Sequence, residues 1–191
     1  LPDGYNTEQP KRSHGITHVH HFYTKRNLFV LAFLMNNYNN WSYKHRITFL
    51  ISSINIHINK MRRYQPAKPG GTPGLPGTLY ISSNPIELSV FDIIPRKLRG
   101  IIKGTLRKSQ NRFVIQSTQS ATDMLNTPTN SIDYIFTDPP FGANLNYSEL
   151  NFIWEAWLKI FTNNESEAII NKVQKKELVE YQDLMTKCFE E

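Results

Sequence analysis

The prediction of a fold for this sequence depends mainly on the stretch "SIDYIFTDPPFG" (131–142). Residues 131–137 are mostly apolar, which is typical of a strand covered on both faces of a parallel sheet. The strand stops at Asp138, because Pro139 and Pro140 fix two backbone angles and have no N–H for a neighbouring strand. Ligands of open α/β sheets bind beyond the carboxyl ends of the strands, so we expect Asp138 at a ligand-binding edge.

The segments around this strand predict the rest of a sheet. "RFVIQST" (112–118) has the composition of a second strand, and residues 120–126 predict a short helix or a turn. Apolar residues at helical spacing predict two helices after the prolines, over residues 147–162 and 167–191. The order strand, turn, strand, loop, helix, helix belongs to the α/β class, and we expect part of a Rossmann-like sheet.

The N-terminal part of the chain predicts helices. Residues 24–37 form an apolar helical pattern that Thr24 can cap. Residues 41–64 predict a second helix, although their β-branched side chains leave a strand open. Residues 87–108 predict a basic amphipathic helix, in which Pro95 either introduces a kink or starts the main part. A helix-rich region therefore precedes the α/β part.

A Pro/Gly-rich stretch, "QPAKPGGTPGLPG" (65–77), separates these helices. It lacks the G-K-[ST] ending of a phosphate-binding loop and no helix follows it, so we interpret it as a flexible loop. A short strand is expected over residues 78–82. The chain thus divides into a basic, helix-rich region (1–110), which is a candidate for DNA binding, and a partial α/β core (111–191).

Charge is distributed unevenly along the chain, whose formal net charge is +6. Residues 1–112 hold 17 Lys and Arg against 4 Asp and Glu, whereas residues 113–191 hold 5 against 12. A basic region of this size predicts a polyanionic partner, because binding to phosphates releases condensed counterions. Only the cluster supports this prediction, since a single cation is ordinarily a solvated surface charge. The candidate contacts are Lys25, Arg26, Lys44, Arg46, Arg62, Arg63, Arg96, Lys97, Arg99, Lys103, Arg107 and Lys108.

Composition excludes several classes of protein. The single cysteine, Cys188, rules out an internal disulfide framework and suits a reducing compartment, so we expect a cytoplasmic protein. The longest apolar run, residues 28–35, is too short to span a bilayer, and the polar N-terminus does not resemble a secretory signal. His18, His20 and His21 lack the spacing of a metal site, so no metal is expected.

The proline corner at residues 138–141 presents groups suited to one kind of chemistry. Asp138 has a carboxylate and Pro139 a carbonyl, and each of these acceptors can bind one N–H of an exocyclic amino group on a nucleobase. An amine held in this way becomes pyramidal, which frees its lone pair to attack an electrophilic methyl group. Phe141 offers an aromatic face for the base, and Gly142 allows a close approach. A base within a duplex must first be flipped out.

"SIDYIFTDPPFG" resembles the catalytic motif [D/N/S]-P-P-[Y/F/W] of S-adenosylmethionine-dependent amino methyltransferases, which make N6-methyladenine or N4-methylcytosine in DNA. "VIQSTQSATDML" (114–125) resembles the strand and acid that precede this motif, and "NYSELN" with "WEAWL" is similar to the segment that follows it. The wider chain also resembles prokaryotic site-specific DNA methylases. The resemblance implies a Rossmann-like fold, S-adenosylmethionine as cofactor and DNA as partner.

The resemblance also implies roles for individual residues. Asp138 would accept from the target amino group, and Pro139 would offer its carbonyl. Pro140 would hold the corner and Phe141 would stack on the base. Asp123 falls where the family often places an acid near the adenine of the cofactor. The acidic form of the motif resembles adenine-specific enzymes, so we expect N6-adenine methylation in a restriction–modification system or by an orphan methylase.

The glycine-rich cofactor loop of this family is absent from the sequence. Motif order varies in the family by circular permutation, and the chain starts at Leu1 rather than Met and ends in a helical pattern without a stop signal. We therefore expect a segment of a longer enzyme. Two alternatives stay open: an RNA base amino methyltransferase that uses the same corner, and a nucleic-acid-binding module without catalysis. The recognition sequence and the oligomeric state also stay open.

Residues just past the corner have two interpretations. Asn146, Tyr147 and Glu149 can line the same pocket. Alternatively, Ser148 and Glu149 can cap and begin the next helix, because serine and glutamate suit a helix N-terminus. The two tryptophans of "WEAWL" (154–158) have helical spacing, and we expect them in the core rather than beneath a base.

Overall fold

The computed structural model describes residues 1–38, 42–68, 70–106 and 114–191. The chain divides into two compact units. Unit 1 consists of Leu1–Lys108 and Glu149–Phe161, and unit 2 consists of Ser109–Ser148 and Thr162–Glu191. The sequence-based division between residues 110 and 111 stays a prediction. Unit 1 contains Glu149–Phe161 in addition to the N-terminal region, so the two units are not continuous stretches of the chain.

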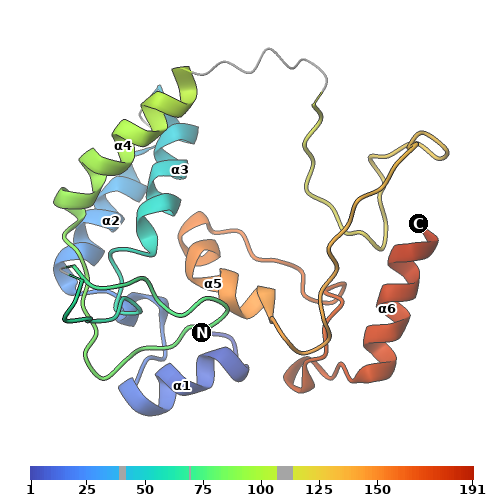
Figure 1. Ribbon diagram of the computed structural model, residues 1–191, viewed down its shortest axis with the longest axis horizontal. Helices are drawn as coiled ribbons and strands as arrows, with labels where there is room; N and C mark the ends of the chain where they lie inside the picture. The colour runs from blue at the N-terminus through green and yellow to red at the C-terminus, as the bar shows by residue number, and fades with distance from the viewer. Residues whose placement is uncertain (39–41, 69, 107–113) are drawn as a thin grey trace. The chain divides into compact units, whose positions relative to one another are not determined.

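Unit 1 is built from helices (Figure 1). They are α1 (Tyr5–His14), the 3₁₀ helix η1 (Val19–Phe22), α2 (Lys25–Asn37), α3 (Lys44–Asn55), α4 (Val90–Leu106) and most of α5 (Tyr147–Leu158). The helices predicted over residues 24–37, 87–108 and 147–162 are confirmed, and the helix predicted over residues 41–64 is confirmed only over Lys44–Asn55. Trp41, Arg107 and Lys108 lie outside the described residues. α3 resolves the choice between helix and strand, because its isoleucines recur at helical spacing and bury one face.

α2 shows why these predictions hold. The Thr24 hydroxyl accepts a hydrogen bond from the Asn27 N–H at 3.4 Å, as expected of an N-cap. The helix contains no glycine or proline, and its leucines, alanine and methionine are good helix formers. Leu31 is fully buried on its inner face. The helix therefore forms as its local sequence predicts, although Phe29 and Phe33 on its outer face stay exposed.

The core of unit 1 lies between its helices and the loop that leads to α4. Its fully buried apolar side chains are Phe22, Leu31, Ile54, Ile58, Leu79, Ile81, Val90, Ile93 and Ile153. The Trp154 indole donates to the Ser52 carbonyl at 3.1 Å, and the Trp157 indole donates to the Tyr23 hydroxyl at 3.0 Å. Both tryptophans pack on the core, which confirms the expectation for them.

Asn27 connects three segments of this core. Its side-chain amide donates to the carbonyls of Ile58 at 3.1 Å and Leu88 at 2.8 Å, and its oxygen accepts from the Val90 N–H at 3.4 Å. The residue is fully buried. These bonds satisfy backbone groups that would otherwise lie buried without a partner, so they stabilise the loops around α2.

Unit 2 contains less regular structure. It has the short 3₁₀ helix η3 (Lys172–Gln174) and α6 (Leu178–Glu190). Glu177 and Glu180 form a capping box that starts α6. The helix predicted over residues 167–191 is therefore confirmed only for its C-terminal half. Residues 120–126, predicted as a short helix or a turn, form turns.

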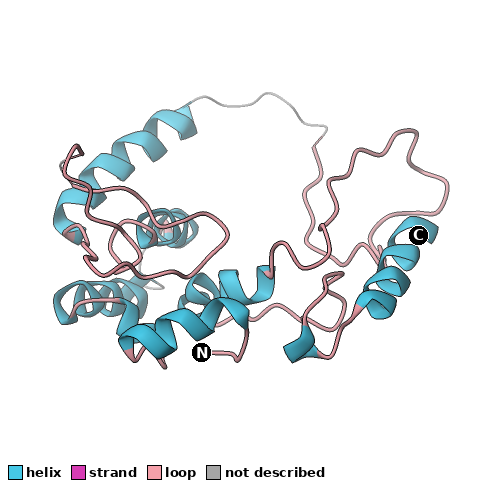
Figure 2. Ribbon diagram, turned by 60° about the horizontal axis from the view of Figure 1, so that its bottom comes forward, coloured by secondary structure: helices cyan, strands magenta, loops and turns pink. Residues whose placement is uncertain are grey.

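The prediction of an α/β fold with a partial Rossmann-like sheet is wrong. The described residues contain helices and isolated β-bridges but no sheet, and Figure 2 draws no strand among them. Residues 131–137 form a loop, as do residues 114–118, and residues 112 and 113 lie outside the described residues. Ile115 is 96% exposed and Phe136 is 86% exposed. Residues 78–82 also lack a strand, although Leu79 and Ile81 are buried.

The physical reason is that a strand needs a partner. An extended backbone leaves its N–H and C=O groups unpaired until another strand lies alongside, whereas a helix pairs them internally. An apolar run indicates that its side chains can be buried against another segment of the chain, but it does not identify that segment. Among the described residues, no strand pairs with 131–137.

Candidate functional site

The proline corner lies in a loop of unit 2, and Gly142 determines how the loop turns. Gly142 has a φ angle of 55°, in the left-handed region that favours glycine. Its carbonyl accepts a hydrogen bond from the Ile170 N–H at 3.1 Å, and the Asn144 N–H donates to the Phe141 carbonyl at 3.1 Å. A Cβ added to Gly142 would lie 3.3 Å from the Ile170 Cδ1. The corner is therefore anchored at its C-terminal side.

A second anchor comes from α6. The Tyr181 hydroxyl donates a hydrogen bond to the Pro140 carbonyl at 2.9 Å. The Pro139 carbonyl, by contrast, has no donor among the described residues. Of the two proline carbonyls, one is thus engaged in holding the corner, and the other keeps its capacity to accept a hydrogen bond.

The two side chains that the sequence assigns to catalysis lie on the surface. Phe141 is 71% exposed, and Asp138 is also exposed. Within the described residues, no hydrogen bond or ion pair engages the Asp138 carboxylate. Four consecutive residues therefore present a carboxylate, a carbonyl and an aromatic ring to solvent. Such a surface can accept two hydrogen bonds and stack a planar group, but it does not itself exclude water.

Asp123 is not joined to this corner. It lies exposed in a turn, where its N–H donates to the Ser120 carbonyl at 3.4 Å. No hydrogen bond or ion pair among the described residues links it to Asp138 or to the prolines. The four residues of the corner, 138–141, lie together because they are consecutive in sequence. The residue that contacts them from a distant segment is Tyr181, through its hydrogen bond to Pro140, and not Asp123.

A polar network supports the loop behind Ile170. Ser148 donates its backbone N–H and its hydroxyl to the Glu167 carboxylate at 2.9 and 2.6 Å. Lys176 donates to the Glu167 backbone carbonyl at 2.7 Å and to the Asn164 carbonyl, and burial lowers the pKa of its ammonium group. Asn171 and Lys176 pair through two backbone hydrogen bonds of 2.8 and 3.0 Å. This network keeps the backbone that anchors Gly142 in place.

The residues past the corner support the helix more than a pocket. α5 begins at Tyr147, so Ser148 lies in its first turn and the Glu167 carboxylate caps its N–H. The Asn146 side chain is buried and accepts from the Asn171 side chain at 3.4 Å. Tyr147 remains exposed. The expectation that Ser148 itself caps the helix is thus replaced by a cap from a distant carboxylate.

Glu149 has a structural role inside unit 1. Its carboxylate is buried and accepts from the Asn6 backbone N–H at 2.8 Å and from the Asn6 side chain at 3.2 Å. A Cβ on Gly4 would lie 2.2 Å from the Glu149 Cδ, so a side chain at this position would displace the Glu149 carboxylate. The sequence could not reveal this pair, because its members are separated by 143 positions.

Most of the predicted basic contacts lie on the surface of unit 1. Those that are exposed are Lys25, Arg26, Lys44, Arg46, Arg96, Arg99 and Lys103, whereas Arg107 and Lys108 lie outside the described residues. Arg62 differs, since it is buried and donates to the carbonyls of Gly70 at 2.5 Å and Gly71 at 2.9 Å. Burial, followed by the charge of Arg96, lowers its pKa. Arg62 therefore fastens the Pro/Gly-rich loop.

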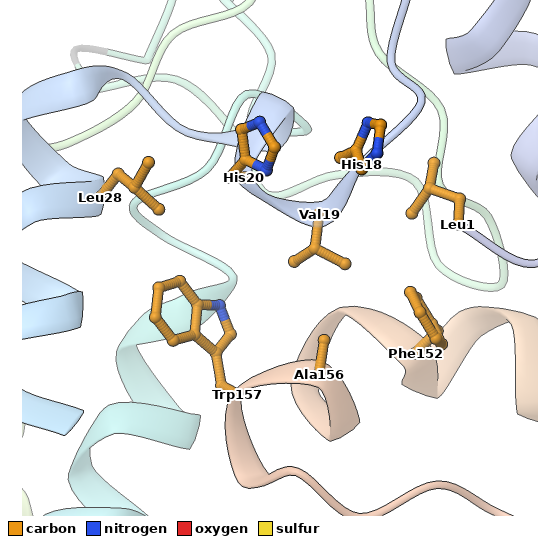
Figure 3. A pocket seen from close by; sticks show the side chains of 8 residues that line it. All are labelled: Leu1, His18, Val19, His20, Leu28, Phe152, Ala156 and Trp157. Atoms are coloured by element: carbon orange, nitrogen blue, oxygen red, sulfur yellow. The ribbon is translucent and has the colours of Figure 1, made fainter. Parts of the chain in front are cut away.

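The histidines of "HVHHFY" lie beside an apolar cavity of about 340 Å³ in unit 1. Figure 3 shows Phe152, Ala156 and Trp157 of α5 facing Val19 of η1 across it. The His20 and His21 rings lie 4.3 Å apart, and burial lowers the pKa of His20, with smaller contributions from its histidine neighbours. In the part of the chain that the structure describes, no group of His, Cys, Asp or Glu side chains is arranged to hold a metal ion.

Comparisons with known proteins find nothing similar to the chain. No family model matches it, and neither a curated protein nor a solved structure does. The candidate site is therefore interpreted from its own residues. Within the described ranges, no helix has both the length and the apolar character needed to cross a membrane.

Proposed function

We propose that the chain belongs to an S-adenosylmethionine-dependent DNA amino methyltransferase whose most favoured target is N6 of adenine. One observation carries the proposal: Asp138, the Pro139 carbonyl and the Phe141 ring are displayed together, and their binding capacity is unused by the described residues. The resemblance of the D-P-P-F motif to amino methyltransferases is the reason for proposing methyl transfer. The exposed carboxylate, carbonyl and ring are the groups that would bind the base.

Asp138 and Pro139 would act on the target amino group. The carboxylate accepts one N–H and the carbonyl accepts the other, so both acceptors favour the pyramidal form of the nitrogen. A carboxylate acceptor forms a charge-assisted hydrogen bond, which is stronger than a neutral one. Asp138 therefore provides most of the activation, and Pro139 fixes the orientation of the amine.

Phe141 and Pro140 would bind and position the base. A ring that is 71% exposed can stack on a flipped base, which stabilises binding by roughly 1–3 kcal/mol. The Pro140 carbonyl is already bonded to Tyr181, so Pro140 and Tyr181 are positioning residues that hold the corner in place. Their effect on the reaction passes through Asp138 and Phe141.

The described residues do not fit S-adenosylmethionine. The sequence has no glycine-rich cofactor loop, and Asp123, which the resemblance assigns to the cofactor, lies exposed in a turn. The proposal for this chain therefore concerns the half of the reaction that binds and activates the base.

Methyl transfer to DNA by the full-length protein tests the role of Asp138. We expect Asp138→Ala to lower the rate by at least about 100-fold, as is usual when a positioned acid–base or hydrogen-bonding group is removed. Asp133→Ala is the matched control, because Asp133 is also an exposed acid of unit 2, five positions upstream. An Asp138→Ala variant as active as the Asp133→Ala variant would remove Asp138 from the mechanism.

Binding of an oligonucleotide that contains 2-aminopurine at the target position tests Phe141 independently of methyl transfer. Loss of stacking in Phe141→Ala should weaken binding about 5- to 150-fold and reduce the fluorescence increase that accompanies base flipping. Phe136→Ala is the control, because Phe136 is also a highly exposed phenylalanine of unit 2. Equal affinities of the two variants would contradict the stacking role.

A second candidate is a nucleic-acid-binding module without catalysis, and the exposed cations of unit 1 favour it. It predicts binding that weakens steeply with salt, together with no calorimetric signal for S-adenosylmethionine in the full-length protein. Competition between labelled duplex DNA and structured RNA separates DNA from RNA as the partner.

A further inference from the structure

A polar cavity of about 380 Å³ lies in unit 1, away from the D-P-P-F corner in the sequence. Among the described residues, Arg63 is the only charged one that lines it. The other described lining residues are neutral, and each carries a hydroxyl or an amide, among them Thr72, Ser82 and Asn84. None of the described lining residues carries a carboxylate, so this lining is positively charged and rich in hydrogen-bond donors.

Backbone pairing builds the walls of this cavity. Arg63 and Thr72 exchange two backbone hydrogen bonds, each of 2.9 Å. On its other side, Arg63 forms a β-bridge with Pro85, and the Tyr64 N–H donates to the Asn84 carbonyl at 3.1 Å. Three separate segments, around residues 63, 72 and 85, are thus held side by side, and main-chain hydrogen bonds fix the lining positions.

Two polar atoms of the lining are buried without a hydrogen-bond partner in the described part of the chain. They are the Nε of Arg63 and the hydroxyl oxygen of Ser82. A buried polar group without a hydrogen bond costs about 1–3 kcal/mol, so most such groups in proteins are satisfied. The ion pairs of the described residues do not include Arg63. These two groups therefore have the capacity to bind a group from outside the chain.

The chemistry of the lining selects an oxyanion. A guanidinium N–H and a hydroxyl are both donors to a phosphate oxygen, and arginine forms strong charge-assisted bonds with phosphate. The absence of a carboxylate from the described lining residues avoids repulsion of an anion. The cavity volume exceeds that of a phosphate group alone. Tyr64 and Tyr80 also line the cavity, and their rings can contact a group attached to the phosphate.

We propose that this cavity binds the phosphate group of a nucleotide or of a nucleic-acid strand through Arg63 and Ser82. The site is independent of the D-P-P-F corner and of methyl transfer. It also differs from a glycine-rich phosphate loop, because side chains of three paired segments supply its donors. The Pro/Gly-rich loop contributes Thr72, while Arg62 bonded to Gly70 and Gly71 keeps that loop beside Arg63.

Calorimetric titration at constant ionic strength tests this site with three probes: inorganic phosphate, adenosine monophosphate and a ten-nucleotide single strand. We expect Ser82→Ala and Arg63→Lys each to weaken binding about tenfold, because each removes one donor and keeps the charge of the cavity. Ser42→Ala and Arg12→Lys are the matched controls, since both residues are exposed, lie outside the cavity and are not among the candidate nucleic-acid contacts.

Thermal unfolding separates a binding role from a structural one. Without added phosphate, Ser82→Ala should unfold at the same temperature as the wild type or slightly higher, because it removes a buried hydroxyl that has no partner. Binding of all three probes would show that the phosphate suffices, and binding of the nucleotide or strand alone would show that the attached group contributes. Absence of binding by every probe, or equal affinities of the variants and controls, would overturn the proposal.

Discussion

The two units of this protein treat similar apolar residues in opposite ways. Unit 1 buries Phe22 and Ile54 completely, whereas unit 2 exposes Ile115 and Phe136 almost completely. Phe22 and Ile54 lie on helices, whose backbone groups are paired before the helices pack together. Ile115 and Phe136 lie on loop segments that have no partner strand among the described residues. Burial thus depends on an available neighbour as much as on the residue itself.

The sharpest test of this contrast compares two phenylalanines. Phe22→Ala should lower the free energy of unfolding by about 3–5 kcal/mol, because it leaves a cavity in the core of unit 1. Phe136→Ala should change it by no more than about 0.5 kcal/mol, since the ring is already in solvent. Urea denaturation followed by circular dichroism measures both. Comparable losses would show that Phe136 is buried in solution.

A buried polar residue gives the next largest effect. Asn27→Ala should destabilise unit 1 by roughly 2–3 kcal/mol, because the carbonyls of Ile58 and Leu88 lose their donor while still buried. Asn126→Ala is the control in unit 2, where Asn126 is exposed. The same denaturation experiment compares them, and a neutral Asn27→Ala variant would mean that water replaces the amide.

Gly142→Ala should have a smaller and local effect in unit 2. A residue with a Cβ costs roughly 1–2 kcal/mol at a φ of 55°, and the added carbon would also press on Ile170. Gly142→Asn should cost less, because asparagine tolerates this conformation. Limited proteolysis of the loop around residue 142 reports the change. Equal cleavage of wild type and Gly142→Ala would contradict the left-handed turn.

The smallest expected effect is a pH dependence in unit 1. Burial, with the charges of Lys97, Arg62 and Arg96, lowers the pKa of His57 to about 4. Because the unfolded histidine binds its proton near pH 6.5, the contribution of His57 to stability is complete above that pH and is lost as the pH falls through about 4.

His57→Gln isolates this contribution. The melting temperature of the wild type should fall more than that of the variant between pH 7.5 and pH 4, because only the wild type must keep an imidazole neutral. Differential scanning calorimetry at both values gives the comparison. Parallel decreases in the two proteins would show that the imidazole is freely protonated in the folded state.

The sequence predicts α2, α3, α4 and α5 better than any other feature, although it gives no prediction for α1. The cap at Thr24 and the helical spacing of the isoleucines in α3 are local signals, and local signals are sufficient for a helix. The sheet failed because residues 131–137 carry the pattern of a strand without information about a partner. Pairing is a property of distant segments, and no short pattern encodes it.

The same distinction applies to the candidate site. The corner itself follows from Pro139 and Pro140, whose restricted backbone acts locally. Its anchors, Tyr181 and Ile170, come from segments that fold back onto it, and nothing near the motif indicates them. Asp123 was assigned by resemblance alone, and the structure leaves it in a separate turn.

Hydrogen exchange of backbone amides shows whether residues 131–137 are paired in solution, because protection reports paired and buried N–H groups segment by segment. We expect strong protection in α2, α3 and α5 and rapid exchange throughout residues 131–137. Protection of residues 131–137 equal to that of α3 would contradict this expectation, since those amides would then be paired in a sheet.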